Sequence, residues 1–295
     1  MPLADRLDPL VEGFPGELGL AVRHLGSGEE YTRRGDELFP MASVFKVPLL
    51  VELFRQVDEG RIELGQRVEV TEDMKSPGSG VIKELSAGTR LTVRDLATLC
   101  IIVSDNTATD LLMSLTDGTR TIRTTMQGLG LLRTNVVSDC RTLILTALGM
   151  DPSLRGTELL PKLRHMRPDF RTAAFKDDLE ANNVTTPTDL ALLFTLLQQR
   201  AVLAPDACGA MLDILGRQQL NGRMPLFLPP NTDTAHKTGT LGWTRNDAGL
   251  IYLPDGDAVA FCALSRKVPE DPYSAWEADR AIGSAARIVF DHFCA

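Results

Sequence analysis

The sequence lacks the features that mark nucleic-acid-binding and membrane-spanning proteins. Its 295 residues carry a formal net charge of −8, which argues against nucleic acid or an anionic membrane surface as a partner. No apolar run approaches the length of a bilayer span, so we expect no stable membrane insertion. Residues 1–8 show no basic stretch followed by an apolar one, so no signal peptide is predicted. Two locations remain possible: the protein is cytoplasmic, or it is exported and its signal has been removed.

Several motifs for metal and nucleophile chemistry are also missing. There is no C-x-x-C, H-E-x-x-H, G-x-S-x-G or G-x-G-x-x-G. The histidines are scattered, so neither a metal site nor an α/β-hydrolase nucleophile is predicted. The cysteines are widely spaced, and we expect buried thiols rather than disulfides or a zinc site. They are Cys100, Cys140, Cys208, Cys262 and Cys294.

What is present describes a soluble globular chain, with 43% hydrophobic and 24% charged residues. Alternating apolar residues predict a hairpin over 17–34, and helices separated by loops follow to about residue 216. Residues 61–90 are interpreted as loop with short elements, and 140–183 are helical only in patches. The period then changes, predicting strands over 235–241, 248–253 and 258–265 and a closing helix over 274–293. This order predicts an α+β fold in which residues 1–40 and 230–295 share one antiparallel sheet. Residues 41–229 form a mostly helical region, with the active site between the two parts.

An apolar run from Met41 to Leu50 contains a serine and a lysine one helical turn apart. If Ser43 opens a helix, it shares a helix face with Lys46 and sits at the positive end of the helix dipole, where an oxyanion is stabilised. An ammonium buried in so apolar a segment is more easily neutralised, so the lysine can accept the hydroxyl proton. The alternative is a serine N-cap on a core helix whose lysine reaches solvent. An isolated S-x-x-K does not decide between them.

Two further motifs follow along the chain. Ser104-Asp105-Asn106 lies between two predicted helices, either as a polar turn that caps the second helix or as a site where Ser104 relays a proton. Lys237-Thr238-Gly239-Thr240 lies on a predicted strand, either as an exposed edge or as an edge that docks an extended acyl substrate. In the second case the lysine and the hydroxyls face a carboxylate, and Gly239 leaves room for close approach.

Together, S-x-x-K, S-D-N and K-T-G, in that order, resemble the signature of class A β-lactamases and penicillin-binding proteins. The resemblance to class A runs from about residue 17 to the end and includes the segment 91–96, Asn106-Thr107-Ala108 and Thr185-Thr186-Pro187. It implies a β-lactamase-like fold, no cofactor, a small-molecule substrate (a β-lactam, or a peptide or ester analogue), and a periplasmic or secreted location.

The resemblance also implies roles for the matched catalytic residues. Ser43 becomes the acylated nucleophile, and Lys46 becomes its base or the partner of its base. Ser104 protonates the leaving nitrogen. Lys237 holds Ser104 and the substrate carboxylate electrostatically.

Further matched residues are expected to bind the substrate. Asn106 binds the acyl side-chain amide, Thr238 and Gly239 belong to the docking strand, and the N–H groups of Ser43 and Thr240 form the oxyanion hole. Arg245, on the following strand, is a candidate second carboxylate clamp, since a guanidinium binds carboxylates bidentately. It is equally well a solvated arginine at a strand end.

One departure from the family pattern concerns deacylation. The family's E-x-x-L-N, whose glutamate activates the deacylating water, does not occur here. The carboxylates considered in its place are Glu158, Asp178 and Glu180, each of which is equally a solvated surface acid. General-base catalysis typically contributes about 10²–10⁴-fold, so its absence would trap the acyl-enzyme.

Three functions therefore remain open at this point. The first is a class A-like serine hydrolase that opens β-lactams through an acyl-serine, with antibiotic resistance or β-lactam catabolism as its setting. The second is a D-Ala-D-Ala peptidase or esterase that uses the same serine. The third is a β-lactam-binding sensor that stays acylated, which the missing E-x-x-L-N favours.

Overall fold

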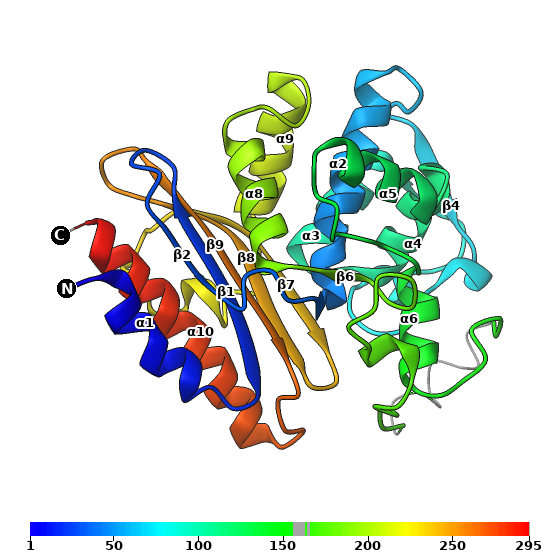
Figure 1. The fold of residues 1–295 in the computed structure, drawn as a ribbon. Helices are drawn as coiled ribbons and strands as arrows, with labels where there is room; N and C mark the ends of the chain where they lie inside the picture. The colour runs from blue at the N-terminus through cyan, green and yellow to red at the C-terminus, as the bar shows by residue number, and fades with distance from the viewer. Residues whose placement is uncertain (156–162, 164–165, 295) are drawn as a thin grey trace.

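The two ends of the chain form one antiparallel sheet, seen on the left of Figure 1. This computed structural model describes residues 1–155, 163 and 166–294. The five-stranded sheet has the order β2-β1-β9-β8-β7. Its strands are β1 (Glu17–His24), β2 (Glu30–Arg33), β7 (Thr234–Leu241), β8 (Thr244–Tyr252) and β9 (Ala258–Arg266). The predicted sheet of N- and C-terminal segments is thus confirmed, with β1 paired along β9 from Glu17↔Arg266 to His24↔Val259.

Helices cover both faces of this sheet. Helix α1 (Leu3–Glu12) and helix α10 (Pro272–Phe293) lie side by side over the outer face, and α8 (Pro187–Gln198) packs against the inner face (Figure 1). A strand covered on both faces is apolar throughout instead of alternating. Accordingly, β9 is buried at every position except its last residue.

The inner face of the sheet meets a mostly helical region, seen on the right of Figure 1. Its helices are α2 (Lys46–Asp58), α3 (Val93–Ile102), α4 (Asn106–Leu115), α5 (Thr119–Gly128), α6 (Cys140–Ala147) and α9 (Pro205–Gly216). Two short strand pairs join it: β3 (Phe39–Pro40) with β6 (Val184–Thr185), and β4 (Arg67–Val70) with β5 (Thr89–Thr92). The division into subdomains at residues 40 and 230 stays a prediction.

Helix α2 is the central helix of this region. It is buried nearly all round, including its only lysine, Lys46, and the carboxylate of Glu52. A helix with no solvated face belongs to the core. Polar groups on it must therefore find partners inside the protein, and these partners connect α2 to its neighbours.

Capping residues set the helix boundaries near the site. Thr92 and Asp95 form a capping box at the start of α3, and Thr186 caps α8, which has a proline in its first turn. Asp105 caps α4 through its Oδ1, which accepts the N–H of Ala108 at 2.9 Å, so the S-D-N segment does cap the second helix. Each cap satisfies backbone donors that a helix start leaves unpaired.

Two expectations from the sequence were wrong, one about a strand boundary and one about a cysteine. Strand β8 begins at Thr244, not residue 248, because a two-residue turn at Gly242–Trp243 keeps it paired with β7 from Leu241↔Thr244 onward. Cys294 is exposed, whereas the other four cysteines are buried as expected. Among the described helices, none is long and apolar enough to cross a membrane.

Candidate active site

One cavity of about 420 Å³ collects the three sequence motifs. It lies between the turn before α2, the loop before α4, the first turns of α6 and the end of β7. Its lining residues are Ala42, Ser43, Phe45, Gly78, Ser79, Ser104, Asn106, Cys140, Leu143, Ile144, Leu220, Thr238, Thr240, Leu241 and Gly242. Lys46 and Lys237 are fully buried and are absent from this lining.

Ser43 sits in a 3₁₀ turn, Ala42–Phe45, directly before α2. The expectation that Ser43 itself opens the α-helix was therefore wrong, since α2 begins at Lys46. Ala42 has a φ of 45°, a conformation that L-residues adopt only when their surroundings enforce it. From β8, the Asn246 side-chain amide donates to the carbonyls of Pro40 and Met41 at 2.8 and 3.0 Å. The sheet thus fixes the approach to the nucleophile.

Lys46 connects the first motif to the second. Its Nζ donates to the Ser104 carbonyl at 2.7 Å, to Ser104 Oγ at 3.1 Å and to Asn106 Oδ1 at 2.7 Å. A buried ammonium is tolerated only when its donors are satisfied in this way. The lysine therefore joins the hydroxyl of Ser104 to the floor of the cavity that holds Ser43.

The S-D-N loop is held by its middle residue. Asp105 Oδ2 accepts the N–H groups of Val81 and Ile82 at 2.6 and 2.9 Å, which fixes the 77–82 loop against α4. Ser104 has a φ of 54°. The Asn106 amide donates to the Pro77 carbonyl at 2.7 Å while its oxygen accepts Lys46. Asn106 therefore also positions the cavity wall, besides facing the cavity.

The K-T-G strand lies directly against the nucleophile turn. A Cβ on Gly239 would stand 2.6 Å from the Met41 carbonyl oxygen and 3.2 Å from the Val44 nitrogen, so a glycine is required there. Lys237 Nζ donates to the Thr238 carbonyl at 2.8 Å. Burial, helped by the positive charge of Lys46, lowers the pKa of Lys237 to about 7.

Arg223 is a site residue that the sequence did not reveal. Its Nη2 donates to Thr240 Oγ1 at 2.6 Å and its Nη1 to the Gly239 carbonyl at 3.0 Å, while Nε pairs with Asp279 at 2.6 Å. Arg223, Thr238, Thr240 and Asp279 line a second hollow that shares residues with the cavity. No motif surrounds Arg223, so only the tertiary contacts identify it.

Arg245, the predicted second clamp, lies on β8 opposite Thr240 and lines neither hollow. Burial lowers the pKa of its guanidinium, with smaller effects from the charges of Asp279 and Arg223. The side chain that hydrogen-bonds Thr240 and lines the second hollow is that of Arg223 and not that of Arg245.

The wall opposite the K-T-G strand is apolar. We call it the α6 wall; it consists of Cys140, Leu143 and Ile144. These residues occupy positions 1, 4 and 5 of Cys140-Arg141-Thr142-Leu143-Ile144, which has the spacing of E-x-x-L-N with only the leucine retained. The Cys140 thiol is buried, and burial raises its pKa well above the ordinary range. None of the described lining residues is a carboxylic acid.

The carboxylates considered for deacylation do not reach this cavity, as far as the structure describes them. Glu180 is exposed and pairs with Arg123, with Oε1 and Nη2 2.6 Å apart. Asp178 accepts the Glu180 N–H at 2.8 Å, and neither residue lines the cavity. Glu158 lies outside the described residues.

Asp110 of α4 holds the α6 wall in place. Its carboxylate accepts the N–H groups of Cys140 and Arg141 at 2.7 and 3.1 Å and the Ser76 hydroxyl at 2.5 Å. Burial, helped by the nearby charge of Asp139, raises the pKa of Asp110 to about 6. One carboxylate thus joins α6 and the 76–80 loop, on two sides of the cavity. Among the described residues, no cluster of His, Cys, Asp and Glu could hold a metal ion.

Comparison with known proteins agrees with this geometry. A model of the β-lactamase enzyme family matches residues 2–293. The β-lactamase VEB-1 of Pseudomonas aeruginosa is 24% identical, over 98% of this chain and 89% of that protein. A mutant of PBP-A, solved as an acyl-enzyme complex with penicillin G, is 27% identical with a TM-score of 0.79, covering 99% of this chain and 96% of the other.

An ancestral class A β-lactamase is 25% identical with a TM-score of 0.80, over 99% of this chain and all of the other (100%). The predicted α+β fold is therefore confirmed as that of class A β-lactamases. Since the family match extends over nearly the whole sequence, this chain belongs to the β-lactamase enzyme family.

Proposed function

We propose that β-lactams acylate this protein at Ser43 and that the acyl group leaves slowly. The observation that carries the proposal is the contact of buried Lys46 with Ser104 and Asn106, at the floor of the cavity that Ser43 lines. A serine hydroxyl is a weak nucleophile until an adjacent base takes its proton. Lys46 is the buried base candidate one turn along the chain from Ser43.

Acylation follows from these groups with protons balanced. The Ser43 proton passes to Lys46, acting as its base, as Oγ bonds to the β-lactam carbonyl carbon, and the carbonyl oxygen becomes an oxyanion held by the N–H groups of Ser43 and Thr240. Breaking the C–N bond leaves a ring nitrogen that takes the Ser104 hydroxyl proton. Lys46, 3.1 Å from Ser104 Oγ, then returns a proton to Ser104.

The carboxylate of the β-lactam is expected to bind on the β7 side of the cavity. Protonated Lys237, the hydroxyls of Thr238 and Thr240, and the guanidinium of Arg223 supply positive charge and hydrogen-bond donors there. Charge-assisted bonds of this kind are roughly twice as strong as neutral ones. Asn106 keeps one amide N–H beyond its bond to Pro77, and we assign it to the acyl side-chain amide.

Slow release of the acyl group follows from the α6 wall. Hydrolysis of the ester needs a base within hydrogen-bond reach of a water molecule. Neither end of the α6 wall supplies such a base. The Cys140 thiol stays protonated because burial raises its pKa, and Ile144 is apolar. This favours the sensor function, in which β-lactams stay covalently bound, over rapid hydrolysis.

Intact-mass spectrometry after mixing with benzylpenicillin tests the proposal. We expect the mass to rise by one whole penicillin and to stay raised long after free drug is removed. Ser43→Ala should show no adduct, whereas Ser27→Ala, an exposed turn serine, should label like the wild type. An adduct on Ser43→Ala contradicts the nucleophile assignment. Rapid, sustained hydrolysis by the wild type contradicts slow release but leaves acylation standing.

A further inference from the structure

A second, larger hollow lies away from the catalytic cavity. We call it the α5 groove; it has a volume of about 700 Å³ and is bordered by α2, α5 and the α8–α9 turn. Its lining residues are Arg55, Asp117, Arg120, Thr121, Thr124, Thr125, Gly128, Leu129, Val202 and Leu203. It shares no lining residue with the catalytic cavity. Arg55 stands nine residues after Lys46 on α2, about 14 Å along the helix.

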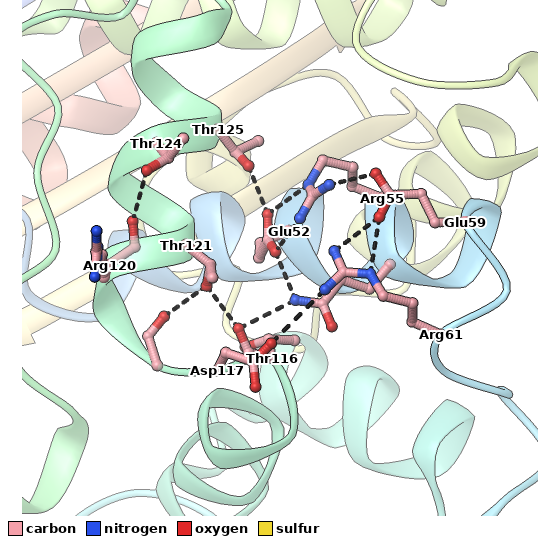
Figure 2. Close-up of polar contacts among 12 residues, drawn as sticks. Glu52, Arg55, Glu59, Arg61, Thr116, Asp117, Arg120, Thr121, Thr124 and Thr125 are labelled. Carbon is pink, nitrogen blue, oxygen red and sulfur yellow. Dashed lines mark hydrogen bonds and ion pairs between the residues drawn. The ribbon is translucent and has the colours of Figure 1, made fainter.

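The polar side of the groove is a fixed network, drawn in Figure 2. The buried Glu52 carboxylate accepts Arg55 Nε and Nη2 at 2.8 and 2.7 Å, Gln56 Nε2 at 2.6 Å and Thr125 Oγ1 at 2.5 Å. Burial pushes the pKa of Glu52 upward, but these donors outweigh it and hold the pKa below its ordinary value. The carboxylate is saturated, so it holds Arg55 and Thr125 in place at the groove surface.

The guanidinium groups keep donors for a ligand. Arg55 is bound to Glu52 and Glu59, and a guanidinium carries more N–H groups than these contacts use. Among the described residues the guanidinium of Arg120 makes no hydrogen bond or ion pair, and no dashed contact reaches it in Figure 2. Arg120 therefore offers a positive charge to a ligand, whereas Arg55, whose charge is balanced by Glu52 and Glu59, offers only its remaining N–H groups.

The threonines present only acceptors. The Thr121 hydroxyl donates to the carbonyls of Thr116 and Gly118 at 2.6 and 2.9 Å, and that of Thr124 donates to the Arg120 carbonyl at 3.1 Å. The Thr125 hydroxyl donates to Glu52. Each hydroxyl has one proton, so the lone pairs that remain can only accept from a ligand. Asp117, with its side chain 70% exposed, adds a carboxylate at the rim; it is paired loosely with Arg61, at 3.7 Å, and keeps lone pairs that can accept from a ligand.

We propose that the α5 groove binds a short zwitterionic peptide with apolar side chains. The peptide carboxylate pairs with Arg120 and Arg55, and its ammonium donates to the threonine hydroxyls and Asp117. Leu129, Val202 and Leu203 contact the apolar side chains. The volume lies within the range of sites for ligands larger than a single amino acid. A simple anion leaves the acceptors unused, and a simple cation leaves the guanidinium groups unused.

The test compares three probes by isothermal titration calorimetry. They are leucyl-leucine, its N-acetyl derivative, which lacks the ammonium, and its C-terminal amide, which lacks the carboxylate. The protein is used with and without prior treatment with benzylpenicillin, so that binding in the catalytic cavity is told apart from binding in the groove. We expect leucyl-leucine to bind both forms equally and each derivative to bind about tenfold more weakly. Equal affinity for all three probes, or no binding of leucyl-leucine, overturns the proposal.

Two exposed variants assign the contacts. Arg120→Gln should weaken leucyl-leucine about tenfold and abolish the preference over the amide, and Asp117→Asn should reduce the preference over the N-acetyl derivative. Asparagine tolerates the φ of 60° that Asp117 adopts. The matched control is Arg94→Gln, on an exposed α3 position outside the groove. If Arg120→Gln binds like Arg94→Gln, the site is not this groove. The comparison stays valid even where benzylpenicillin fails to acylate Ser43.

Discussion

Replacing Cys140 with glutamate is expected to convert a stable acyl-enzyme into one that turns over. Cys140 faces the cavity from the first turn of α6, and its backbone N–H is held by Asp110 at 2.7 Å. The substitution therefore adds a carboxylate without moving the main chain. A general base typically contributes about 10²–10⁴-fold, equivalent to roughly 3–5 kcal/mol of transition-state stabilisation.

The surroundings decide how much of this gain is realised at a given pH. Burial and the carboxylate of Asp110 should raise the pKa of a glutamate at position 140, as they raise that of the Cys140 thiol, while the positive charge of Lys46 opposes them. Only the ionised form acts as a base. The rate of acyl release by Cys140→Glu should therefore rise with pH between 6 and 8, and the full gain should be reached at the alkaline end.

Cys140→Gln is the matched control, because it has the size of glutamate without its basicity. Acylation and release are followed separately by quenched-flow mass spectrometry with benzylpenicillin. Adding Ile144→Asn, which restores both ends of E-x-x-L-N, should accelerate release further by orienting the water. If Cys140→Glu is acylated normally and releases the acyl group no faster than Cys140→Gln at pH 8, the α6 wall is not what limits turnover.

Three further outcomes are expected. As Lys237 loses its proton above pH 7, the KM of acylation by a carboxylate-bearing β-lactam should rise, while the KM of an uncharged ester should not change. If the two KM values change in parallel with pH, Lys237 does not bind the carboxylate. Gly239→Ala should slow acylation at least about tenfold, because its methyl group would clash with the turn that carries Ser43. Gly65→Ala, with open space around its Cα, is the control and should leave the rate of penicillin labelling unchanged. Arg223→Lys should weaken carboxylate-bearing substrates about tenfold and Arg245→Lys much less, measured as acylation KM; equal effects would restore Arg245 as the clamp.

Much of the site could be predicted because its residues are fixed by local signals. Thr92 and Asp105 place the helices around the S-D-N loop through capping bonds that the sequence already indicates. Capping bonds join residues three positions apart, so a single sequence is enough to predict them. Gly239 was expected where the backbone needs room, but only the folded structure shows that the Met41 carbonyl occupies that space.

The remainder depends on contacts between distant segments. Arg223 acquires its place from Asp279, 56 residues away, and from Thr240, and nothing near it in the sequence indicates this. The α6 wall could not be predicted for a different reason. Of the residues in E-x-x-L-N, only the leucine, Leu143, is retained here, and a cysteine in a charged, weakly periodic segment carries no signal by itself.

The hydrogen bonds between Asn246 and the turn before Ser43 mean that the nucleophile is positioned only late in folding. Asn246 reaches Pro40 across 206 residues of sequence, and the β1–β2 hairpin cannot join the rest of the sheet until β9 exists. Closing so long a loop is entropically costly, and topologies rich in distant contacts fold slowly. A nascent chain that still has β8 and β9 inside the ribosome holds Ser43 and Lys46 but not the sheet that positions them. On the proposed acylation of Ser43, covalent capture of penicillin would report completion of the whole fold, and a pulse of fluorescent penicillin during refolding would time that last step directly.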